Sequence, residues 1–323
     1  MNRVLLKKCL LDVRLLFAAC ALALFAFCWL RVYIVSRLEL SSFAAIIEKL
    51  WDKWKDFWPV PLSHLLTYTG RIGVTFDEPI VVFCIAIFAI ARGSDSVSGE
   101  LNRGTLEMLL AQPVSRLQVL YSQALVTTAA LALLCLVGWC GIWAGVETTQ
   151  VTEEAPRAAV KVPGLPWEIP YSFEAPKKVH VPMRTKVRMD DFIPGSVVLF
   201  SLGFCLAGVS TLFSSWDRYR WRTIGLAVTF YVIHLILKIM GMAIPEVSWL
   251  KKLSIFTAYE PQKFIAVAAQ APDDTWRLAF FDPQGNFGEL GPLGYNLVLL
   301  GIGGVCYLAA GVMFHQRDLP APL

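Results

Sequence analysis

Six separate stretches of mostly apolar residues constrain the fold of this chain more than any other feature of its sequence. They span about residues 15–35, 72–91, 119–146, 193–213, 223–244 and 293–314. A helix of roughly 20 apolar residues crosses a hydrocarbon core about 30 Å thick, so each stretch is long enough for one crossing. The second stretch is the weakest, because Asp77 and Glu78 interrupt it.

The composition agrees with this pattern. Hydrophobic residues make up 56% of the 323 residues and charged residues only 17%, whereas soluble domains have about 45–50% and about 25%. We therefore predict an all-α polytopic membrane protein with six transmembrane helices. The net charge of +4 is too small to indicate a nucleic-acid partner, and contact with anionic membrane lipid accounts for it.

Six spans place both termini on one side of the membrane. Lysine and arginine are dense in the segments that would share that side: Arg3, Lys7, Lys8, Arg14, Arg92, Arg103, Arg116, Arg218, Arg220, Arg222 and Arg317. The positive-inside rule assigns short segments rich in these residues to the cytoplasm. We therefore expect a multi-pass protein of the inner (cytoplasmic) membrane with both termini in the cytoplasm.

Two amphipathic segments flank the first span within what we treat as a single domain over 1–323. Residues 1–14 are predicted to form a helix along the cytoplasmic interface, with a simple extension of the first span as the alternative. Residues 36–71 are predicted to be external. They contain an amphipathic helix at 42–58, whose apolar residues recur at helical spacing.

The later external segments are longer. Residues 147–191 contain six prolines and are predicted to be an external loop, with a strand or hairpin near 177–189 and a candidate protein partner. Residues 245–292 are predicted to be an external or re-entrant hairpin, broken by Pro261. His180, Met183 and Met189 are of the type that binds soft metals, but we favour incidental placement and predict no metal site.

The connection over 92–118 has the strongest local signals. Thr105 is predicted to be the N-cap of a short helix, and Glu107 places negative charge in its first turn. Pro113 ends this helix, and tight turns are expected at Gly99, Gly104 and Pro113. Ser115 and Gln118 then form a capping box, which begins a new helix near Arg116.

The short helix has one apolar face, made of Leu106, Leu109 and Leu110. A helix of two turns is not stable alone in water, so this face must pack on another surface. We interpret that surface as a partner protein. The alternative is packing within the chain, with Pro-Val-Ser-Arg acting only as a helix start.

Residues 99–116 read Gly-Glu-Leu-Asn-Arg-Gly-Thr-Leu-Glu-Met-Leu-Leu-Ala-Gln-Pro-Val-Ser-Arg. This segment resembles the signature of ABC-2-type ABC transporter permeases, and it is most similar to the branch of nitrous-oxide-reductase maturation permeases. The resemblance implies a coupling helix that sits in a groove of a separate ATPase. The residues it assigns to coupling are Gly99, Glu100, Arg103, Gly104, Thr105, Leu106, Glu107, Leu109, Leu110, Pro113, Ser115 and Arg116.

The resemblance also implies a permease subunit that moves a substrate, in the export direction, when a partner hydrolyses ATP. Such permeases pair, so we expect a homodimer with two copies of an ABC ATPase. The chain has no GxxxxGK[ST] segment. We therefore expect that it is not an enzyme and binds no cofactor of its own, and that ATP and Mg are held by the partner.

Ionisable residues within or beside apolar spans are candidates for a translocation path. Here they are Asp77 and Glu78 at the mouth of the second span, and His234 and Lys238 one turn apart in the fifth. The alternatives are an N-terminal helix turn for the two acids and snorkelling to the interface for Lys238.

Two other functions stay open at this point. One is a non-transporting membrane anchor that transmits ATPase motion to an external partner through the 147–191 loop. The other is an intramembrane enzyme, which would need a nucleophile such as Ser201 or Ser210 beside His234 as base.

Overall fold

The structure, a computed structural model, describes residues 3–38, 60–154, 159–161, 168–170, 178–281 and 287–317. The amphipathic helix predicted at 42–58 lies outside these residues. Six helical segments of the described part are long and apolar enough to cross a membrane: Val4–Arg37, Tyr68–Asn102, Arg116–Thr148, Met189–Trp216, Arg220–Ala243 and Pro292–Gln316. The predicted all-α fold with six spans is confirmed.

Six long helices of the described chain form the bundle. They are α1 (Arg3–Arg37), α5 (Pro79–Ser94), α8 (Arg116–Thr148), α9 (Ile193–Trp216), α10 (Arg220–Ala243) and α12 (Pro292–Gln316). A proline stands in the first turn of α5, α9 and α12, where its missing N–H costs nothing. Helix α1 runs without a break, so its first turns extend the first span and do not form a separate helix.

The second span is composite. It starts as α4 (Tyr68–Gly73) and η2 (Val74–Phe76), breaks at Asp77 and Glu78, and resumes as α5. Beyond α5 the chain continues through a π-helical turn, η3 (Asp95–Gly99), into α6 (Glu100–Asn102). The helical path therefore extends well past the predicted end of the span at residue 91. Gly99 lies inside this path, so the turn expected there is wrong.

Helix α9 lies at the centre of the bundle and packs against α5, α8, α10 and α12. Small residues allow the closest approaches. A Cβ at Gly208 of α9 would lie 2.5 Å from the carbonyl oxygen of Gly303 on α12, and a Cβ at Gly203 would lie 2.8 Å from Ile85 on α5. Glycine at these positions lets the helices pack at backbone distance.

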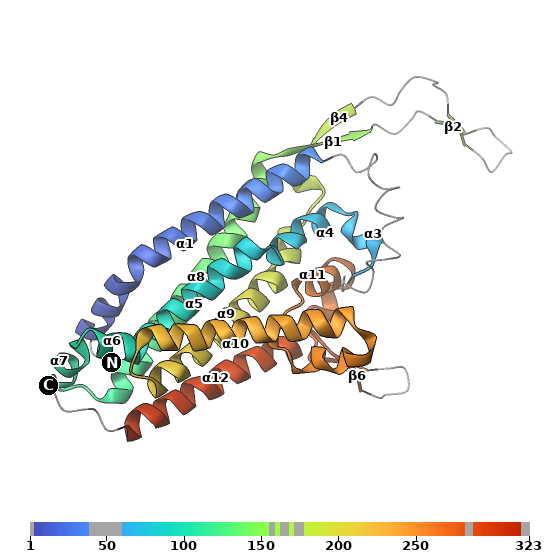
Figure 1. Cartoon of the computed structure of the whole chain (residues 1–323). Helices are drawn as coiled ribbons and strands as arrows, with labels where there is room; N and C mark the ends of the chain where they lie inside the picture. Colours follow the sequence, from blue (N-terminus) through green and yellow to red (C-terminus); the bar gives the residue numbers. More distant parts are fainter. Residues whose placement is uncertain are drawn as a thin grey trace.

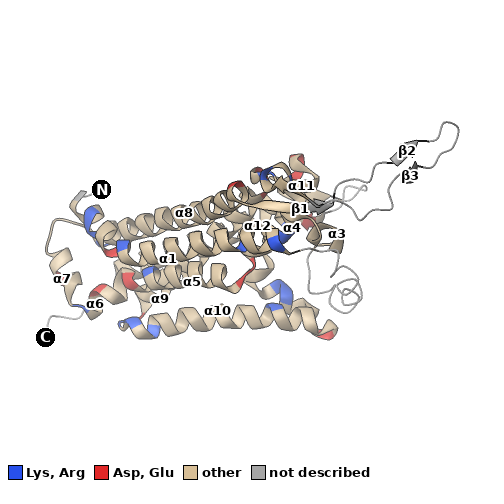
Figure 2. Ribbon diagram, turned by 90° about the horizontal axis from the view of Figure 1, so that it is seen from above, with Lys and Arg blue, Asp and Glu red and all other residues tan. Residues whose placement is uncertain are grey.

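The two ends of the bundle differ in what they hold (Figure 1). The start of α1, the end of α12, α6 and α7 (Thr105–Leu110) lie together at one end, which we call the α7 end. The other end, the α11 end, holds α3 (Leu62–Leu65), α4 and α11 (Pro261–Gln270). Charged residues gather toward both ends, and most of each long helix between them is uncharged (Figure 2).

Short antiparallel hairpins complete the α11 end. Strand β1 (Gln150–Glu154) pairs with β4 (Lys178–Pro182), so that Thr152 lies opposite His180. Strand β2 (Ala159–Lys161) pairs with β3 (Glu168–Pro170), and β5 (Ala279–Phe281) pairs with β6 (Phe287–Leu290). The β1–β4 hairpin continues directly from α8 and projects from the bundle (Figure 1).

The segment before the last span is packed against the chain itself. It runs through the 3₁₀ helices η6 (Pro245–Leu253) and η7 (Ile255–Thr257), then α11 and η8 (Pro272–Asp274). Phe256, Phe264 and Ile265 are buried. Pro261 occupies the first turn of α11, and η7 ends before it at Thr257, so the predicted break of this apolar stretch at Pro261 is confirmed.

Candidate functional site at the α7 end

Helix α7 is held between sharp changes of chain direction. Gly104 is its N-cap, with φ of +69°, a left-handed conformation that favours glycine. The prediction of Thr105 as N-cap is wrong, because Thr105 is the first helical residue and its hydroxyl donates to the Glu100 carboxylate. After Pro113, the predicted capping box is present: the Ser115 side chain accepts from the backbone N–H of Gln118, whose side chain accepts from the N–H of Ser115.

The apolar face of α7 rests on the chain itself. Leu106 is only 1% exposed and belongs to a buried cluster with Val97, Leu120 and Phe314. The expectation that this face meets a partner protein is therefore wrong for Leu106. The outer face is the one that stays open to a partner, and there Met108 is 72% exposed beside the exposed Glu107.

Glu100 connects the α7 segment to the rest of the bundle. It is 1% exposed, and its carboxylate accepts from Lys8 Nζ on α1 at 2.6 Å and lies 3.2 Å from Arg103 Nη2. Thr105 Oγ1 and, at 3.5 Å, Gln123 Nε2 of α8 donate to the same carboxylate. A buried carboxylate with this many donors fixes three segments relative to one another.

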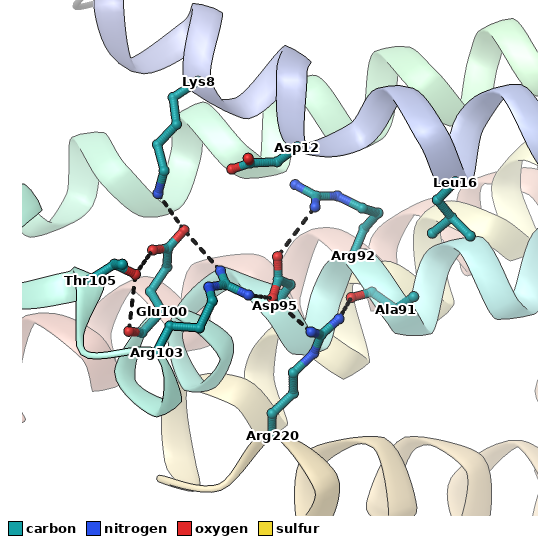
Figure 3. A pocket seen from close by; sticks show the side chains of 10 residues that line it. All are labelled: Lys8, Asp12, Leu16, Ala91, Arg92, Asp95, Glu100, Arg103, Thr105 and Arg220. Atoms are coloured by element: carbon teal, nitrogen blue, oxygen red, sulfur yellow. Dashed lines mark hydrogen bonds and ion pairs between the residues drawn. The ribbon is translucent and has the colours of Figure 1, made fainter.

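Asp95 is a second centre of opposite charge. Its carboxylate lies 2.7 Å from Arg103, 3.3 Å from Arg92 and 3.3 Å from Arg220 of α10. Arg103 therefore bridges both carboxylates (Figure 3). Burial opposes its charged form, but Asp95 and Glu100 outweigh burial and raise the pKa of Arg103. We call these residues the ion cluster: Lys8, Arg92, Asp95, Glu100, Arg103 and Arg220.

The π-helical turn η3 gives the ion cluster its shape. A Cβ at Gly99 would lie 2.2 Å from Asp95 Oδ1, so glycine leaves the room that the carboxylate occupies. The backbone N–H groups of Val97 and Ser98 donate to Ser214 Oγ of α9 at 3.1 and 2.9 Å. Short π-helical turns are frequent at functional sites, and this one is fastened to the central helix.

The last predicted coupling residue has an internal partner. Arg116 donates through Nη1 to the carbonyl oxygen of Arg317 at 2.5 Å, and those of Phe314 and His315 lie at 3.5 Å. It thus satisfies backbone carbonyls at the end of α12. The predicted coupling residues divide into an inner set tied to the bundle, which includes Glu100, Leu106 and Arg116, and an outer set that includes Glu107 and Pro113.

Sequence reasoning missed Asp95 and Ser214 and gave Lys8, Arg92 and Arg220 only a topological role. One signal was available, since Arg92 and Asp95 stand three residues apart at the end of an apolar span. Charges so close to hydrocarbon need partners. No sequence spacing joins them to residues 8 and 220, which only the fold brings together.

The translocation-path candidates lie toward the α11 end. Glu78 is 3.2 Å from Arg31 of α1, and Asp77 is exposed. Lys238 donates to the carbonyl oxygens of Phe256 at 2.8 Å and Tyr259 at 3.2 Å. The ammonium group of Lys238 is therefore held by backbone of the packed segment after α10, and snorkelling to the interface stays a prediction.

The residues of the intramembrane-enzyme alternative are not arranged for catalysis. Ser201 donates to Asn296 at 2.7 Å, and Ser210 donates to the carbonyl oxygen of Ile90 at 3.0 Å. His234 Nδ1 bonds within its own helix, 2.9 Å from the carbonyl oxygen of Phe230. In the described part of the chain, no three His, Cys, Asp or Glu residues are grouped so that they could hold a metal ion.

The fold and the site define a multi-pass membrane protein with a short helix mounted between its second and third spans. The sequence profile described as ABC-2 family transporter protein matches residues 34–319, and no curated protein matches the chain. The chain therefore belongs to the ABC-2 transporter family. Membership makes it a membrane permease subunit of an ABC transporter and implies an ABC ATPase as partner.

Proposed function

We propose that this chain couples ATP hydrolysis on a separate ATPase to export of a substrate, and that α7 is the coupling helix. The observation that carries the proposal is the division of α7 into two faces. Leu106 anchors the inner face in the bundle, and Met108 and Glu107 leave the outer face open. A helix built this way can be held from outside while it stays fixed to its own spans.

The ion cluster supports the mechanical part of the proposal. When an ATPase moves α7, Glu100 and Arg103 pass the displacement to α1 through Lys8 and to α10 through Asp95 and Arg220. Packed helices move as rigid bodies between discrete arrangements. A displacement at one end of the spans is thereby carried along them. It changes the side of the membrane to which the substrate path between the spans is open.

The test is co-purification of the full chain with its ATPase. Met108→Asp places a charge on the outer face without touching the buried cluster, and we expect at least tenfold weaker association. Val179→Asp is the matched control, since Val179 is exposed on β4 at the α11 end. Association that is equal in both variants and the parent chain would contradict the assignment of α7.

We propose a homodimer with two ATPase copies, in the inner membrane, with both termini and α7 in the cytoplasm. The start of α1 and the end of α12 share one end of the bundle (Figure 1), which supports a common side for the termini. Few residues in the apolar stretches of α10 and α1 are buried, unlike those of α9, and these surfaces are open to lipid or to a second copy. Reporter fusions at either terminus test sidedness, and cross-linking from α10 tests pairing.

We also propose membership of the nitrous-oxide-reductase maturation branch, on the strength of residues 99–116. The expected partner is then the ATPase of such a system. Co-expression with that ATPase and with one from an unrelated ABC transporter provides the test. Equal binding to both ATPases would remove the basis for this branch.

The membrane-anchor alternative is favoured by one observation, the β1–β4 hairpin that projects from the end of α8. An anchor would use this hairpin to act on an external partner. Deletion of residues 152–180 separates the two functions. An anchor loses function with ATP hydrolysis intact, whereas a permease continues to move its substrate.

A further inference from the structure

A cavity of about 510 Å³ opens beside the ion cluster, between α1, the α5–α6 path and α10. Besides the ion cluster it is lined by Asp12, Leu16, Ala91 and Thr105 (Figure 3). The lining holds four cationic side chains against the carboxylates of Asp95, Glu100 and Asp12. One positive charge is therefore in excess in the wall of the cavity.

Two arginines that line the cavity have unused donors. Arg92 is only 5% exposed, and its Nη1 contacts Asp95 at 3.3 Å. The Nε atoms of Arg92 and Arg220 are buried with no hydrogen-bond partner in the described part of the chain. An unsatisfied buried donor is costly, and a guanidinium fork matches the oxygen atoms of phosphate.

The surroundings of the cavity fit the head-group level of a bilayer. Trp216, Tyr219 and Trp221 are exposed where α9 turns into α10, next to Arg220. Exposed tryptophan and tyrosine mark the membrane–water interface. Basic pockets between spans at this level are suited to anionic lipid head groups.

An apolar stripe leads away from the cavity along α1. Lys8, Asp12 and Leu16 line the cavity at intervals of four residues, and Ala19 and Ala23 continue the same helical face. Both alanines are exposed. Small side chains at these positions leave space for a hydrocarbon chain beside the helix.

We propose that this cavity binds the phosphate group of an anionic phospholipid. Arg92 and Arg220 hold the phosphate oxygens, Asp12 at the rim disfavours a second anion, and one acyl chain follows Ala19 and Ala23. The proposal does not depend on the coupling role of α7. It adds a lipid ligand to the place where α1, α10 and the α7 segment are joined.

The test uses the full purified chain and native mass spectrometry. The probes are phosphatidylglycerol, phosphatidylcholine and soluble glycerol phosphate, each supplied at the same concentration. We expect retention of phosphatidylglycerol, with roughly tenfold less in Arg220→Gln because a charged donor is lost. Arg218→Gln is the matched control, since Arg218 is exposed on the same turn and does not line the cavity.

A second variant separates lipid from free phosphate. Ala23→Phe fills the stripe without changing any charge, and it is expected to lower phosphatidylglycerol retention severalfold while Arg92 and Arg220 stay in place. Arg220→Lys keeps the charge without the fork. Arg220→Lys replaces Arg220→Gln in the test if Arg220→Gln does not fold. It should retain an amount of phosphatidylglycerol between those of the parent chain and Arg220→Gln.

Three results would overturn the proposal. The first is that Arg220→Gln retains as much phosphatidylglycerol as the control Arg218→Gln does. If Arg220→Lys replaces Arg220→Gln, the same comparison applies to it. The second is that soluble glycerol phosphate binds as tightly as phosphatidylglycerol and that Ala23→Phe leaves phosphatidylglycerol retention unchanged. This result would assign the site to a free phosphate. The third is retention of none of the three probes, which would leave the cavity to water alone.

Discussion

The two ends of the bundle satisfy their charged groups in different ways. At the α7 end, Asp95 and Glu100 share Arg103, and side chains of α1 and α10 complete the ion cluster. At the α11 end, Lys238 donates to backbone carbonyls and Arg31 pairs with Glu78. One end is a connected network, and the other consists of separate local contacts.

This difference indicates where motion can be transmitted. In a network that joins helices through shared side chains, displacing one side chain leaves the charge of another without its partner. The joined helices therefore move as a unit. Separate contacts can break one at a time. The predictions that follow measure this contrast, from the largest expected change in stability to the smallest.

Removal of Glu100 is expected to have the largest effect. Glu100→Ala leaves Lys8 and Arg103 without their shared carboxylate. Both side chains are partly exposed, so we expect a loss of about 3 kcal/mol, at the lower end for a broken buried pair. Thermal unfolding in detergent measures the loss. Glu107→Ala, at an exposed position of α7, is the control, and equal midpoints would show that the network carries no stability.

A methyl group at Gly99 should disturb the same end through Asp95. Gly99→Ala places its Cβ 2.2 Å from Asp95 Oδ1, which forces the carboxylate away from Arg103 and costs about 2 kcal/mol. Gly225→Ala is the matched control, because nothing lies within 4 Å of a Cβ at that position of α10. A Gly99→Ala variant as stable as Gly225→Ala would mean that Asp95 can reposition freely.

The six spans could be predicted because the bilayer requires long apolar segments, and each such segment is a continuous stretch of the sequence. The capping box at Ser115 and Gln118 was predictable for a similar reason, since it depends on residues three apart. Both are local properties of the sequence. Their prediction needs no knowledge of which helices become neighbours.

The ion cluster could not be predicted because its partners are distant in sequence. Glu100 and Lys8 are 92 residues apart, and Asp95 meets Arg220 only because α10 packs against η3. The apolar face of α7 was correctly recognised, but the pattern of leucines does not reveal whether it meets a partner or the chain itself. The turn predicted at Gly99 was wrong for the same reason, because the sequence does not show which parts of the chain become neighbours. Glycine is present there because the Asp95 carboxylate occupies the space that a side chain would need.

Loss of the Lys238 ammonium group is the matching experiment at the α11 end. Lys238→Met keeps the aliphatic length but leaves the carbonyl oxygens of Phe256 and Tyr259 without this donor. We expect a cost of about 1.5 kcal/mol, roughly half that of Glu100→Ala. The same unfolding assay compares the two, and a cost above that of Glu100→Ala would reverse the contrast between the ends.

A smaller effect is expected where α8 begins. Ser115→Ala removes the side chain that accepts from Gln118 N and should cost about 1 kcal/mol. Ser115→Asp preserves an acceptor at the N-cap and is expected to restore most of the loss. If both variants match the parent chain, the start of α8 is fixed by packing instead of by its cap.

The smallest effect concerns the Arg31–Glu78 pair, which joins α1 to the break before α5. Their side chains are 20% and 31% exposed, so water screens the attraction and we expect a coupling of about 0.5 kcal/mol. A double-mutant cycle with Arg31→Gln and Glu78→Gln isolates this coupling from the cost of each substitution. The corresponding cycle for Lys8→Gln and Glu100→Gln should give a larger value, because Glu100 is almost completely buried. Equal couplings in the two cycles would remove the distinction between a connected and a local arrangement of charges.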